Sequence, residues 1–545
     1  MIAATAPTAG HPPEEPDNGV NESTFWVLWS GDTDQQNVTA NLTAREQLTA
    51  TTDVPFDQPP AAVDRWNRND LRELPTTDAT TAAHPRAATT TDGTYLKDVG
   101  VAIAAVSPST RTRLSPADQP LYVPPSGTVL GAIDYRIELP EPDAGSVSWS
   151  IDDHEIETVR LLVDGEPVAT TSGARTVALE YEDVAPSPDD GRTLTLEATV
   201  RATVTRTVSR TVTTCTGSGT NRRCSSTTRT TSRSYSESVT VSQQQPVTIY
   251  DLTISGYRAA YPDGDEGTVV YRNRPWYGVE LPNGEVRGVW RYYAARDQGW
   301  DQLVVTDGEG SQTRHSPVHP VQLNAYPIEP GPVPDPPGRV QLLATYGITY
   351  DAPTLPPNVE LDTIEGTYTG SYGIAARTPA APDAQSITAV GLVRGSSTTV
   401  DRESFAHVSL NRSQLSLTIT ETTPETVTVR ARLQDETTGE PIATTGRDGY
   451  LTVDGQRANT TADGTVAVTV ARTDDAVTAR YVPGHWWEHD PGYVGASTTV
   501  YTGGTVLRLL RALFRLAVPV GTLLVAAFLI DRMTGGSLWP PWRGM

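Results

Sequence analysis

Apolar and polar residues alternate along much of the chain, which is typical of β-strands with one buried and one exposed face. Asp-Gly pairs such as Asp164-Gly165 and Asp454-Gly455 separate apolar runs and predict tight hairpin turns. Helical periodicity is scarce, with one short candidate helix around 61–74. The clearest alternation opens the segment from Thr193 to Gln245, where every second residue is apolar: Leu194, Leu196, Ala198, Val200, Ala202 and Val204.

Changes in composition and runs of proline divide the 545 residues into segments. The closely spaced prolines of 327–337 favour an extended, stiff linker. We predict a flexible leader remnant (1–20), an irregular β-rich N-terminal region with short helices (21–125), a β-sandwich (126–254) with a long hairpin (193–245), an aromatic-rich β block (255–326), a Pro-rich linker (327–337), a small β segment (338–405), a second β-sandwich (406–503), a transmembrane helix (504–532) and a short tail (533–545).

The second predicted sandwich contains a run that resembles a known class of module. Residues 427–432, 437–442 and 459–468 follow one another as strand, Gly-containing turn and strand. This arrangement resembles prokaryotic immunoglobulin-like (Big or transthyretin-like) surface modules. The resemblance implies a spacer or adhesive fold and transfers no catalytic residue, since such folds host many functions. The predicted fold class is mainly β: a multi-domain, immunoglobulin-like β-sandwich ectodomain with a long disulfide-tipped β-hairpin and one C-terminal transmembrane α-helix.

An uncharged apolar run, 516–530, lies near the C-terminus and predicts a membrane anchor. Alone it is short for a hydrocarbon core, which needs about 20 residues. Extension towards Val506 adds Arg508, Arg511 and Arg515 on one helical face, from which they can reach lipid phosphates. A buried helix of a soluble domain is the competing interpretation.

The side of the membrane that holds the body of the chain is indicated by weaker signals. Three arginines precede the apolar core and Arg532 and Arg543 follow it, which favours a cytoplasmic body, although long domains translocate largely regardless of charge. The small residues Ala3, Ala4 and Ala6 resemble the end of a secretory leader; the alternative is a disordered cytoplasmic terminus. A close cysteine pair and five N-glycosylation sequons favour the outside: Asn21, Asn37, Asn41, Asn411 and Asn459. We predict a single-pass cell-membrane protein with an extracytoplasmic N-terminal body.

Segment 193–245 predicts a long hairpin whose arms meet near Cys215 and Cys224. These are the two cysteines of the chain, and their spacing is not that of a thiolate metal site. An isolated two-stranded ribbon is marginally stable in water, so a disulfide near its tip would stabilise it. Two free thiols in a disordered loop are the alternative.

This hairpin is basic in an acidic chain of net charge −23. Between Ala198 and Ser236 there are seven arginines and no acidic residue: Arg201, Arg206, Arg210, Arg222, Arg223, Arg229 and Arg233. We predict that they dock an anionic glycan, a lipid headgroup or an acidic protein. Nucleic acid is not expected, because Tyr235 is the only aromatic residue available for base stacking there. The alternative is a solvated ribbon whose arginines balance nearby carboxylates.

The composition also points to a high-salt setting. Lys97 is the single lysine among the 42 basic residues, against 65 acidic ones. Abundant acid and threonine with almost no lysine resemble the proteomes of salt-loving archaea, in which a short Debye length makes high net charge tolerable. An ordinary acidic protein is the alternative.

Other candidate chemistry is weak. His485-Trp-Trp-Glu488-His489 matches the His-x-x-Glu-His pattern of inverted zinc peptidases, but Pro-Gly pairs at 483–484 and 491–492 preclude the helix that this chemistry needs. Acidic turns at 32–34 and 263–266 could hold calcium but lack the full loop pattern. We therefore predict no metal and no cofactor.

The aromatic stretch 270–300 leaves an enzyme alternative open. Its rings could line a carbohydrate- or peptide-directed site at a domain junction, although aromatic residues more often fill cores; they are Trp276, Tyr277, Trp290, Tyr292, Tyr293 and Trp300. We predict instead a non-enzymatic, membrane-anchored cell-surface structural or interaction protein, stalk- or adhesin-like. An anchored subunit of a secretion, pilus or virion assembly is a further alternative.

Overall fold

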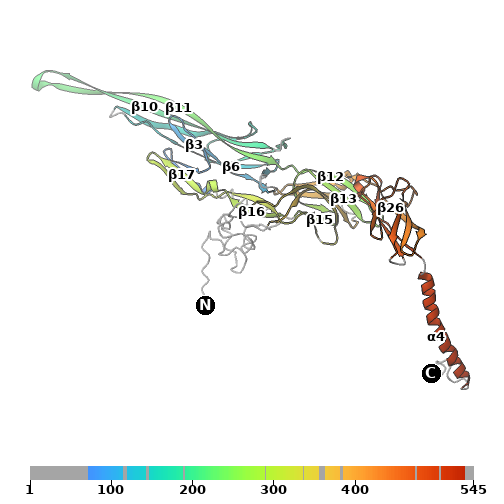
Figure 1. Ribbon diagram of the computed structural model, residues 1–545. Coiled ribbons are helices and arrows are strands. Elements are labelled where there is room, and N and C mark those ends of the chain that lie inside the picture. The colour runs from blue at the N-terminus through green and yellow to red at the C-terminus, as the bar shows by residue number, and fades with distance from the viewer. Residues whose placement is uncertain are drawn as a thin grey trace, which may run out of the picture. The chain divides into compact units, whose positions relative to one another are not determined.

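The computed structural model describes residues 71–113, 120–142, 146–187, 191–288, 290–335, 337–354, 363–380, 385–472, 476–502 and 505–533. It confirms the predicted fold class, with β-strands throughout and one long C-terminal helix (Figure 1). The chain divides into two compact units. The first comprises Met1–Gly256 with Val270–Ser404, and the second comprises Tyr257–Val269 with Phe405–Met545.

The N-terminal part of the first unit is a two-layer β-sandwich. A four-stranded sheet has the order β2-β3-β6-β9, and an eight-stranded sheet has the order β16-β19-β4-β5-β11-β10-β7-β8. The elements before residue 250 are η2 (Leu71–Glu73), β1 (Ala82–Pro85), β2 (Thr89–Thr91), β3 (Leu96–Ser107), β4 (Thr110–Thr112), β5 (Leu121–Val123), β6 (Gly127–Ile137), β7 (Val147–Val163), β8 (Glu166–Thr171), β9 (Thr176–Tyr181), β10 (Arg192–Thr216), η3 (Gly219–Asn221) and β11 (Arg223–Ile249).

The core of this sandwich is built from the alternation seen in the sequence. The inward residues of β10, from Leu194 to Val204, are at most 2% exposed, while the residues between them are partly exposed. They pack against residues of β3, β6 and β9 such as Val101, Val129 and Val177. Burial of this continuous apolar face, at about 25 cal/mol per Å², holds the two sheets together.

Strand β3 lies in a region that the sequence suggested was separate from the sandwich. It pairs with β6 over Leu96–Ser107, and its residues Leu96, Val99 and Val101 are completely buried in the shared core. The sandwich therefore begins well before residue 126. Part of the predicted helix at 61–74 lies outside the described residues, and the described part contains the 3-10 turn η2.

The rest of the first unit mixes strands from distant parts of the chain. Its elements are β13 (Glu266–Arg272), β14 (Trp276–Leu281), β15 (Gly284–Arg287), β16 (Trp290–Arg296), η4 (Gln298–Trp300), β17 (Gln302–Asp307), β18 (Gly310–His315), β19 (Val321–Pro327), β20 (Val333–Asp335), β21 (Gln341–Tyr350), β22 (Tyr368–Thr378), β23 (Ser386–Gly391), β24 (Ser397–Asp401) and η5 (Arg402–Ser404). Because β14 pairs with β23, segments 255–326 and 338–405 contribute to one sheet, of order β20-β15-β14-β23-β24.

The Pro-rich run 327–337 is not a free linker along its whole length. Its residues Val333–Asp335 form β20, which pairs with β15 at the edge of that sheet. Proline cannot donate a hydrogen bond to a neighbouring strand, and an edge strand is where a sheet tolerates this.

The second unit contains a compact β-sandwich. Two four-stranded sheets, β30-β27-β26-β32 and β29-β28-β31-β33, enclose a core that includes Val429, Leu433 and Leu451, all completely buried. The elements are β12 (Ile254–Ala260, which begins in the first unit), β25 (Ala406–His407), β26 (Leu410–Thr422), β27 (Thr426–Asp435), β28 (Tyr450–Val453), β29 (Gln456–Ala458), β30 (Thr465–Ala471), β31 (Ala476–Val482), η6 (Trp486–Glu488), β32 (Gly492–Val494), β33 (Ser497–Tyr501) and α4 (Thr505–Met533).

The Asp-Gly pairs make the tight turns that the sequence predicts. Asp454 and Gly455 have φ angles of 43° and 84°, and Asp164 and Gly165 have φ angles of 50° and 90°. In each pair the flanking residues face each other across a two-residue loop. Left-handed backbone at both loop positions matches the twist of the flanking strands, which explains the choice of Asp and Gly.

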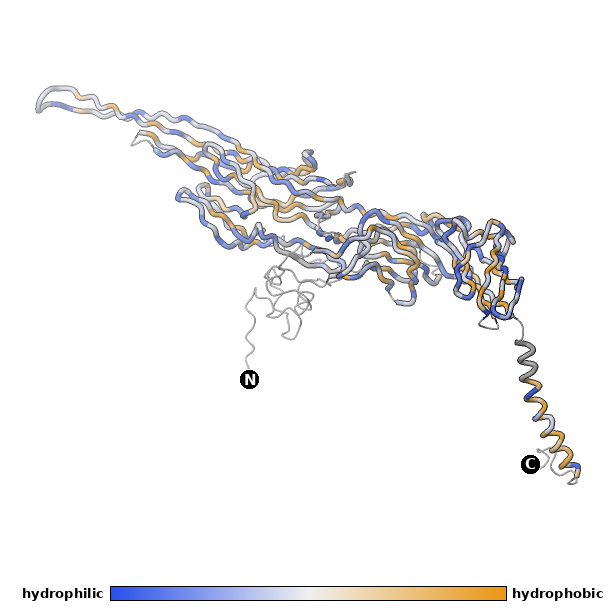
Figure 2. Tube along the Cα trace, in the orientation of Figure 1, coloured by the Kyte–Doolittle hydropathy of each residue, from blue (hydrophilic) through white to orange (hydrophobic). Residues whose placement is uncertain are grey.

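Helix α4 has 29 residues and contains the predicted apolar run. Its window Leu513–Ile530 has a mean hydropathy of 2.2 and is not buried against any described part of the chain. Figure 2 shows the hydrophobic residues along it. By length and composition this helix can cross a membrane. The Thr522 hydroxyl donates to the carbonyl oxygens of Val518 and Pro519, at 3.0 and 2.9 Å, next to the proline inside the helix.

A pair of substitutions on the same face of β10 tests the sandwich core. We expect Leu196→Ala to lower the free energy of unfolding by about 2–5 kcal/mol, because Leu196 is completely buried between the sheets. Val212→Ala is the matched control, since Val212 is 59% exposed and should change stability by less than about 0.5 kcal/mol. Denaturant unfolding of the detergent-solubilised chain measures both, and equal effects would contradict the assigned core.

Candidate partner-binding ribbon

The long hairpin is the candidate interaction site, and it is formed by β10 and β11. The two strands pair antiparallel in one register along all 25 residues of β10. Strand β7 flanks β10 only as far as the pair Val208–Val147. Beyond that point the hairpin continues as a two-stranded ribbon of roughly 25 Å, at about 3.3 Å per residue (Figure 1). We call this part, 209–230, the ribbon.

One face of the hairpin is a ladder of hydroxyl groups. Threonines of β10 face serines and threonines of β11, and their oxygens are hydrogen-bonded across the strands. The pairs are Thr199–Thr240 (2.9 Å), Thr203–Ser236 (3.4 Å), Thr205–Ser234 (2.7 Å), Thr207–Ser232 (3.0 Å), Thr211–Thr228 (3.0 Å) and Thr213–Ser226 (2.9 Å). Such cross-strand pairs each contribute about 0.2–1 kcal/mol to a sheet. We call this the hydroxyl face.

The predicted disulfide between Cys215 and Cys224 is confirmed. The two residues face each other in the register, with their Cα atoms 4.0 Å apart, on the hydroxyl face next to the tip. The disulfide therefore takes the position that follows the pair Thr213–Ser226 on the hydroxyl face. It closes the turn that contains η3 and restricts the unfolded states of the tip.

The opposite face carries arginines. Side chains alternate between faces along a strand, so the face that is apolar from Leu194 to Val204 continues with Arg206 and Arg210 on β10. Their partners in the register are Arg233 and Arg229 on β11. Arg223 faces Thr216 on the same side. We call these five arginines the basic face: Arg206, Arg210, Arg223, Arg229 and Arg233.

Two rungs of the basic face place like charges directly opposite each other. Arg206 faces Arg233 and Arg210 faces Arg229, an arrangement that destabilises a sheet when the charges are not compensated. Among the described residues none of these four makes an ion pair with a carboxylate. Arg233 lies 5.2 Å from the centre of the Tyr235 ring, which provides a cation–π contact.

Aromatic residues close the core where the basic face begins. Tyr235 lies 5.7 Å from Trp149 and 6.4 Å from Tyr95, between ring centres, and Tyr95 and Trp149 are 5.6 Å apart. All three pack against the sandwich core. Trp149 also faces Arg206 across the strands. The apolar interior thus ends at this cluster, and the arginines follow directly.

Glu237 fastens the foot of the hairpin to β3, a role that the sequence did not reveal. Its carboxylate accepts hydrogen bonds from the backbone N–H groups of Thr94 (2.6 Å), Tyr95 (2.7 Å) and Leu96 (2.8 Å). Burial opposes ionisation, but these donors outweigh it and lower the pKa of Glu237. The contact joins residues more than 140 positions apart, so local pattern carries no signal for it.

The structure sets two of the seven predicted arginines apart from the basic face. Arg201 lies on the other face of β10 and forms an ion pair with Glu155 of β7. It therefore balances a nearby carboxylate, as the alternative interpretation of the sequence proposed for all seven. Arg222 lies in the tip turn, directly after η3, and is exposed.

The glycosylation candidates differ in their surroundings. Asn459 is exposed, whereas the amide of Asn411 donates to the Asp435 carboxylate at 2.8 Å and is half-buried. A glycan on Asn411 would have to displace that bond. Asn21, Asn37 and Asn41 lie outside the described residues.

The aromatic stretch that suggested an enzyme site packs into the protein interior. Trp276, Tyr292 and Trp300 are each 1% exposed, Trp290 is 5% exposed and Tyr277 is 9% exposed. The side chain of Tyr293 is not among those described. A cavity of about 20 Å³, the size of a water molecule, lies beside Trp276 and Trp290, and Glu329 is the acidic residue that lines it.

The His-x-x-Glu-His motif lies in a loop. Trp486–Glu488 form a single 3-10 turn, and both tryptophans are buried. Nδ1 of His485 lies 3.0 Å from the Glu488 carboxylate, and the imidazole stacks on Trp487. Within the described ranges, no three His, Cys, Asp or Glu side chains are arranged to hold a metal ion.

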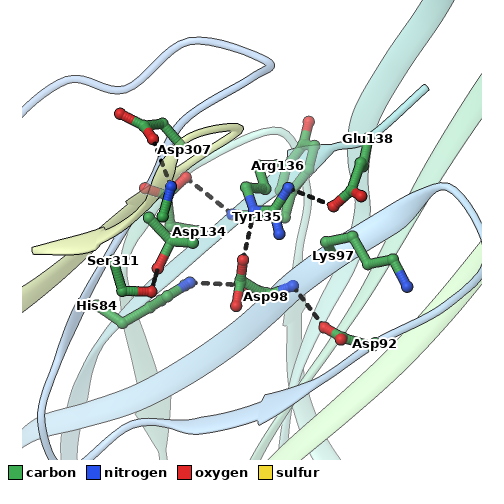
Figure 3. A network of polar contacts seen from close by, with 12 residues as sticks. His84, Asp92, Lys97, Asp98, Asp134, Tyr135, Arg136, Glu138, Asp307 and Ser311 are labelled. Carbon is green, nitrogen blue, oxygen red and sulfur yellow. Dashed lines mark hydrogen bonds and ion pairs between the residues drawn. The ribbon is translucent and has the colours of Figure 1, made fainter. Parts of the chain in front are cut away.

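A polar network between β1, β3 and β6 was a further candidate (Figure 3). Nε2 of the buried His84 donates to the Asp98 carbonyl oxygen at 2.6 Å. The Asp98 carboxylate holds Nε of Arg136 at 2.5 Å, and Arg136 also reaches Glu138 at 2.7 Å. Burial lowers the pKa of His84, although the carboxylate of Asp134 favours its charged form. The imidazole is therefore neutral at neutral pH.

Asp134 is the buried acid of this network, and protein groups surround its carboxylate. It accepts hydrogen bonds from the Thr77 hydroxyl and the Ala83 N–H, at 2.7 and 2.9 Å, and pairs with Arg175 at 2.6 Å. A cavity of about 210 Å³ borders Asp134 and His84. The His84 side chain bonds to a backbone carbonyl of β3, so the network joins strands.

The role of Glu237 predicts a pH dependence. Because its pKa is lowered on folding, the stabilisation is present above the ordinary glutamate pKa of about 4.3 and is lost as the pH falls through the lower folded value. We expect Glu237→Gln to reduce stability by about 1–3 kcal/mol at pH 7 and by much less at pH 3. Exposed Glu166→Gln is the control. Unfolding midpoints across pH 3–7 measure this, and a pH-independent difference would contradict it.

Comparison with known proteins identifies a family. The chain matches the N-terminal, central and C-terminal domain models of DUF8186, a domain of unknown function, over residues 72–250, 254–401 and 410–500. A search of the curated proteins finds none that matches. Among the solved structures, the central fibronectin-III array of RIM-binding protein matches with 11% identity, over 69% of this chain and 93% of that one, with a TM-score of 0.12. A marsupial T cell receptor matches with 10% identity, over 74% of this chain and 99% of that one, with a TM-score of 0.16. These TM-scores are too low to carry a functional conclusion. The three domain models follow one another along most of the chain, which therefore belongs to the DUF8186 family.

Proposed function

We propose that this protein is a non-enzymatic, membrane-anchored structural or interaction protein of the cell surface, and that it docks an anionic partner through the basic face. The observation that carries the proposal is the contrast between the two exposed faces of the ribbon. On the hydroxyl face, neutral threonine and serine side chains are enough to keep the ribbon surface polar. The basic face instead opposes Arg210 to Arg229 with no carboxylate paired to either in the described residues.

The energetics favour a partner over simple solvation. Opposed arginines lower the stability of the ribbon, so a purely structural role would favour neutral residues there, as on the other face. An anion placed between two guanidinium groups removes the repulsion and accepts charge-assisted, bidentate hydrogen bonds. The net charge of the chain outside 198–236 is −30, which is −23 less the +7 of that segment. The hairpin is therefore a segment of net positive charge in a chain that is otherwise strongly acidic.

The anchor and its orientation rest on separate features. An exposed 18-residue apolar window in α4 would be costly in water and is matched to a hydrocarbon core. The Cys215–Cys224 disulfide is typical of an oxidising compartment, which supports an extracytoplasmic body. The exposed sequon at Asn459 is compatible with the same side. The packed aromatic interior around Trp276 and Trp300 favours a structural block over a carbohydrate-binding cleft.

The topology can be tested on intact cells that express the full chain. Protease added from outside should digest the β-domains and leave a small membrane fragment that contains α4, because the body is proposed to lie outside. Detection with an epitope tag at the C-terminus measures the fragment. Lysed cells provide the control for protease access, and a body protected only in intact cells would contradict the orientation.

The basic face can be tested with an acidic polymer as the probe. The chain with Arg206→Ser, Arg210→Ser, Arg229→Ser and Arg233→Ser should bind poly-L-glutamate beads at least tenfold more weakly than the wild-type chain, because the compensating anion contacts are lost. The matched control, Thr211→Ala with Thr228→Ala, changes the hydroxyl face of the same ribbon and should bind like the wild type. The unfolding temperature of the arginine variant should stay close to that of the wild type, because relief of the opposed charges offsets the loss of the contact between Arg233 and the Tyr235 ring. Equal binding by all three chains would refute the proposed role of the arginines.

A further inference from the structure

We propose that the anionic partner of the basic face is a second copy of this chain, bound through an acidic patch on β7. This inference rests on the proposed function, because it names the occupant of the same face. The patch comprises four residues within six positions of β7, all exposed: Asp152, Asp153, Glu155 and Glu157.

Two irregularities in the pairing of β7 with β10 gather these acids. The register shifts between Thr199 and Val200 and again between Thr203 and Val204, where Glu157 and Asp152 have no opposite residue on β10. An extra residue in one strand is left unpaired and the local side-chain direction changes. Regular alternation would have divided the four acids between two faces, whereas the shifts leave all four accessible to solvent.

The patch keeps an unbalanced negative charge within one molecule. Arg201 pairs with Glu155, and the hydroxyls of Thr205 and Ser150 donate to Asp152. Asp153 and Glu157 make no ion pair or hydrogen bond with the residues that the structure describes. Arg201 also interacts electrostatically with Glu157 and Asp153, so the patch holds four carboxylates against one arginine and keeps a net negative charge. This acidic surface lies on the same domain that carries the basic face.

The two charged surfaces lie on opposite faces of one sheet. Arg201 and Thr205, which contact the patch, are on the hydroxyl side of β10, and Arg206 and Arg210 are on the inward side. Because the two surfaces point in opposite directions from the same sheet, the patch and the basic face cannot contact each other within one copy. Between copies they can, and a contact of two different surfaces either closes into a ring or continues as an array.

The spacing of the charges is complementary. The rungs Arg206–Arg233 and Arg210–Arg229 are four residues apart, and so are Asp153 and Glu157. The two rungs lie about 13 Å apart along the strand, at about 3.3 Å per residue. Asp153 and Glu157 lie slightly closer together, because the bulged Glu157 falls between the pairs Thr199–Thr158 and Val200–Ile156. Each of these carboxylates can therefore face one arginine rung when β7 of one copy lies along the hairpin of another. The anionic groups of a glycan or a lipid surface are not spaced by the repeat of a β-strand.

Charge reversal distinguishes this pairing from any other use of the basic face. We would place the full chain, one copy per lipid nanodisc and with two different tags, at about 0.1 M and 1 M salt, and measure co-capture of the two tags. The first variant carries glutamate at all four opposed arginines (Arg206→Glu, Arg210→Glu, Arg229→Glu and Arg233→Glu), the second carries Asp153→Arg and Glu157→Arg, and the third carries all six changes. The first variant replaces two like-charged pairs with two others, so that the repulsion across the strands stays matched.

We expect wild-type copies to associate. The first two variants should each lose at least tenfold in self-association, and the six-change chain should recover to within about threefold of the wild type. A mixture of the first and second variants should also associate, since each supplies the surface that the other lacks. Salt should weaken the association, because charge contacts dominate the interface, and the close guanidinium–carboxylate pairs should retain part of it at 1 M salt. Arg210→Gln with Arg229→Gln provides a second ribbon variant if the glutamates impair folding, which unfolding temperatures reveal.

Other outcomes separate this inference from the proposed function. If the ribbon variants no longer bind poly-L-glutamate beads while self-association is absent or unchanged, the second copy is refuted and an anionic partner of another kind stands. If neither property responds to the ribbon substitutions, both proposals fail. Failure of the six-change chain to associate, with both single-surface variants defective, would refute the direct pairing of the two surfaces.

Discussion

The single register between β10 and β11 is the constraint on which the rest of the N-terminal domain depends. Side chains alternate with a period of two, so a slip of one residue would bury the threonines and expose the row from Leu194 to Val204. The buried half of the hairpin fixes the register through its packing against β3 and β6. That register is then transmitted past the core, where it decides which residues share a face. Both the hydroxyl ladder and the arginine rungs are consequences of it.

The same strand pair solves two different problems along its length. Near the core it must be apolar on one side, and beyond the cluster of Tyr95, Trp149 and Tyr235 both sides face solvent. Hydrogen-bonded hydroxyl pairs and the terminal Cys215–Cys224 bond stabilise the ribbon without charge. Arginines on the other face add charge but no internal ion pair in the described residues. Stability and charge are thus assigned to separate faces, so the basic face can change without unfolding the ribbon.

The features that sequence alone predicts are those carried by local pattern. Alternation predicts β10, Asp-Gly pairs predict the turns at 164–165 and 454–455, and hydropathy predicts the apolar part of α4. The disulfide follows from two cysteines near the predicted tip of one hairpin. Each of these depends on residues that are close together in the chain.

Features that depend on distant pairing escape such analysis. Strand β14 pairs with β23, and β20 pairs with β15 at the edge of the sheet. The residues of each strand do not indicate which distant strand it pairs with. The prolines of 327–337 predicted a linker because proline is excluded from most strands. An edge strand tolerates proline, and the sequence does not show which strand lies at an edge. The same limit applies to the candidate site. Arg201 is indistinguishable from Arg206 in sequence, and only the register with β7 shows that Glu155 neutralises it.

The salt concentration determines how such a charged interface would work. In molar salt the Debye length falls to about 3 Å, so long-range attraction between an acidic body and a basic ribbon is almost entirely screened. Contact pairs are screened much less, because salt ions do not fit between a guanidinium and a bound carboxylate. An interface suited to such conditions therefore needs matched positions more than high total charge. Rungs of opposed arginines at strand spacing supply matched positions, whereas seven arginines scattered over a flexible loop would supply only charge.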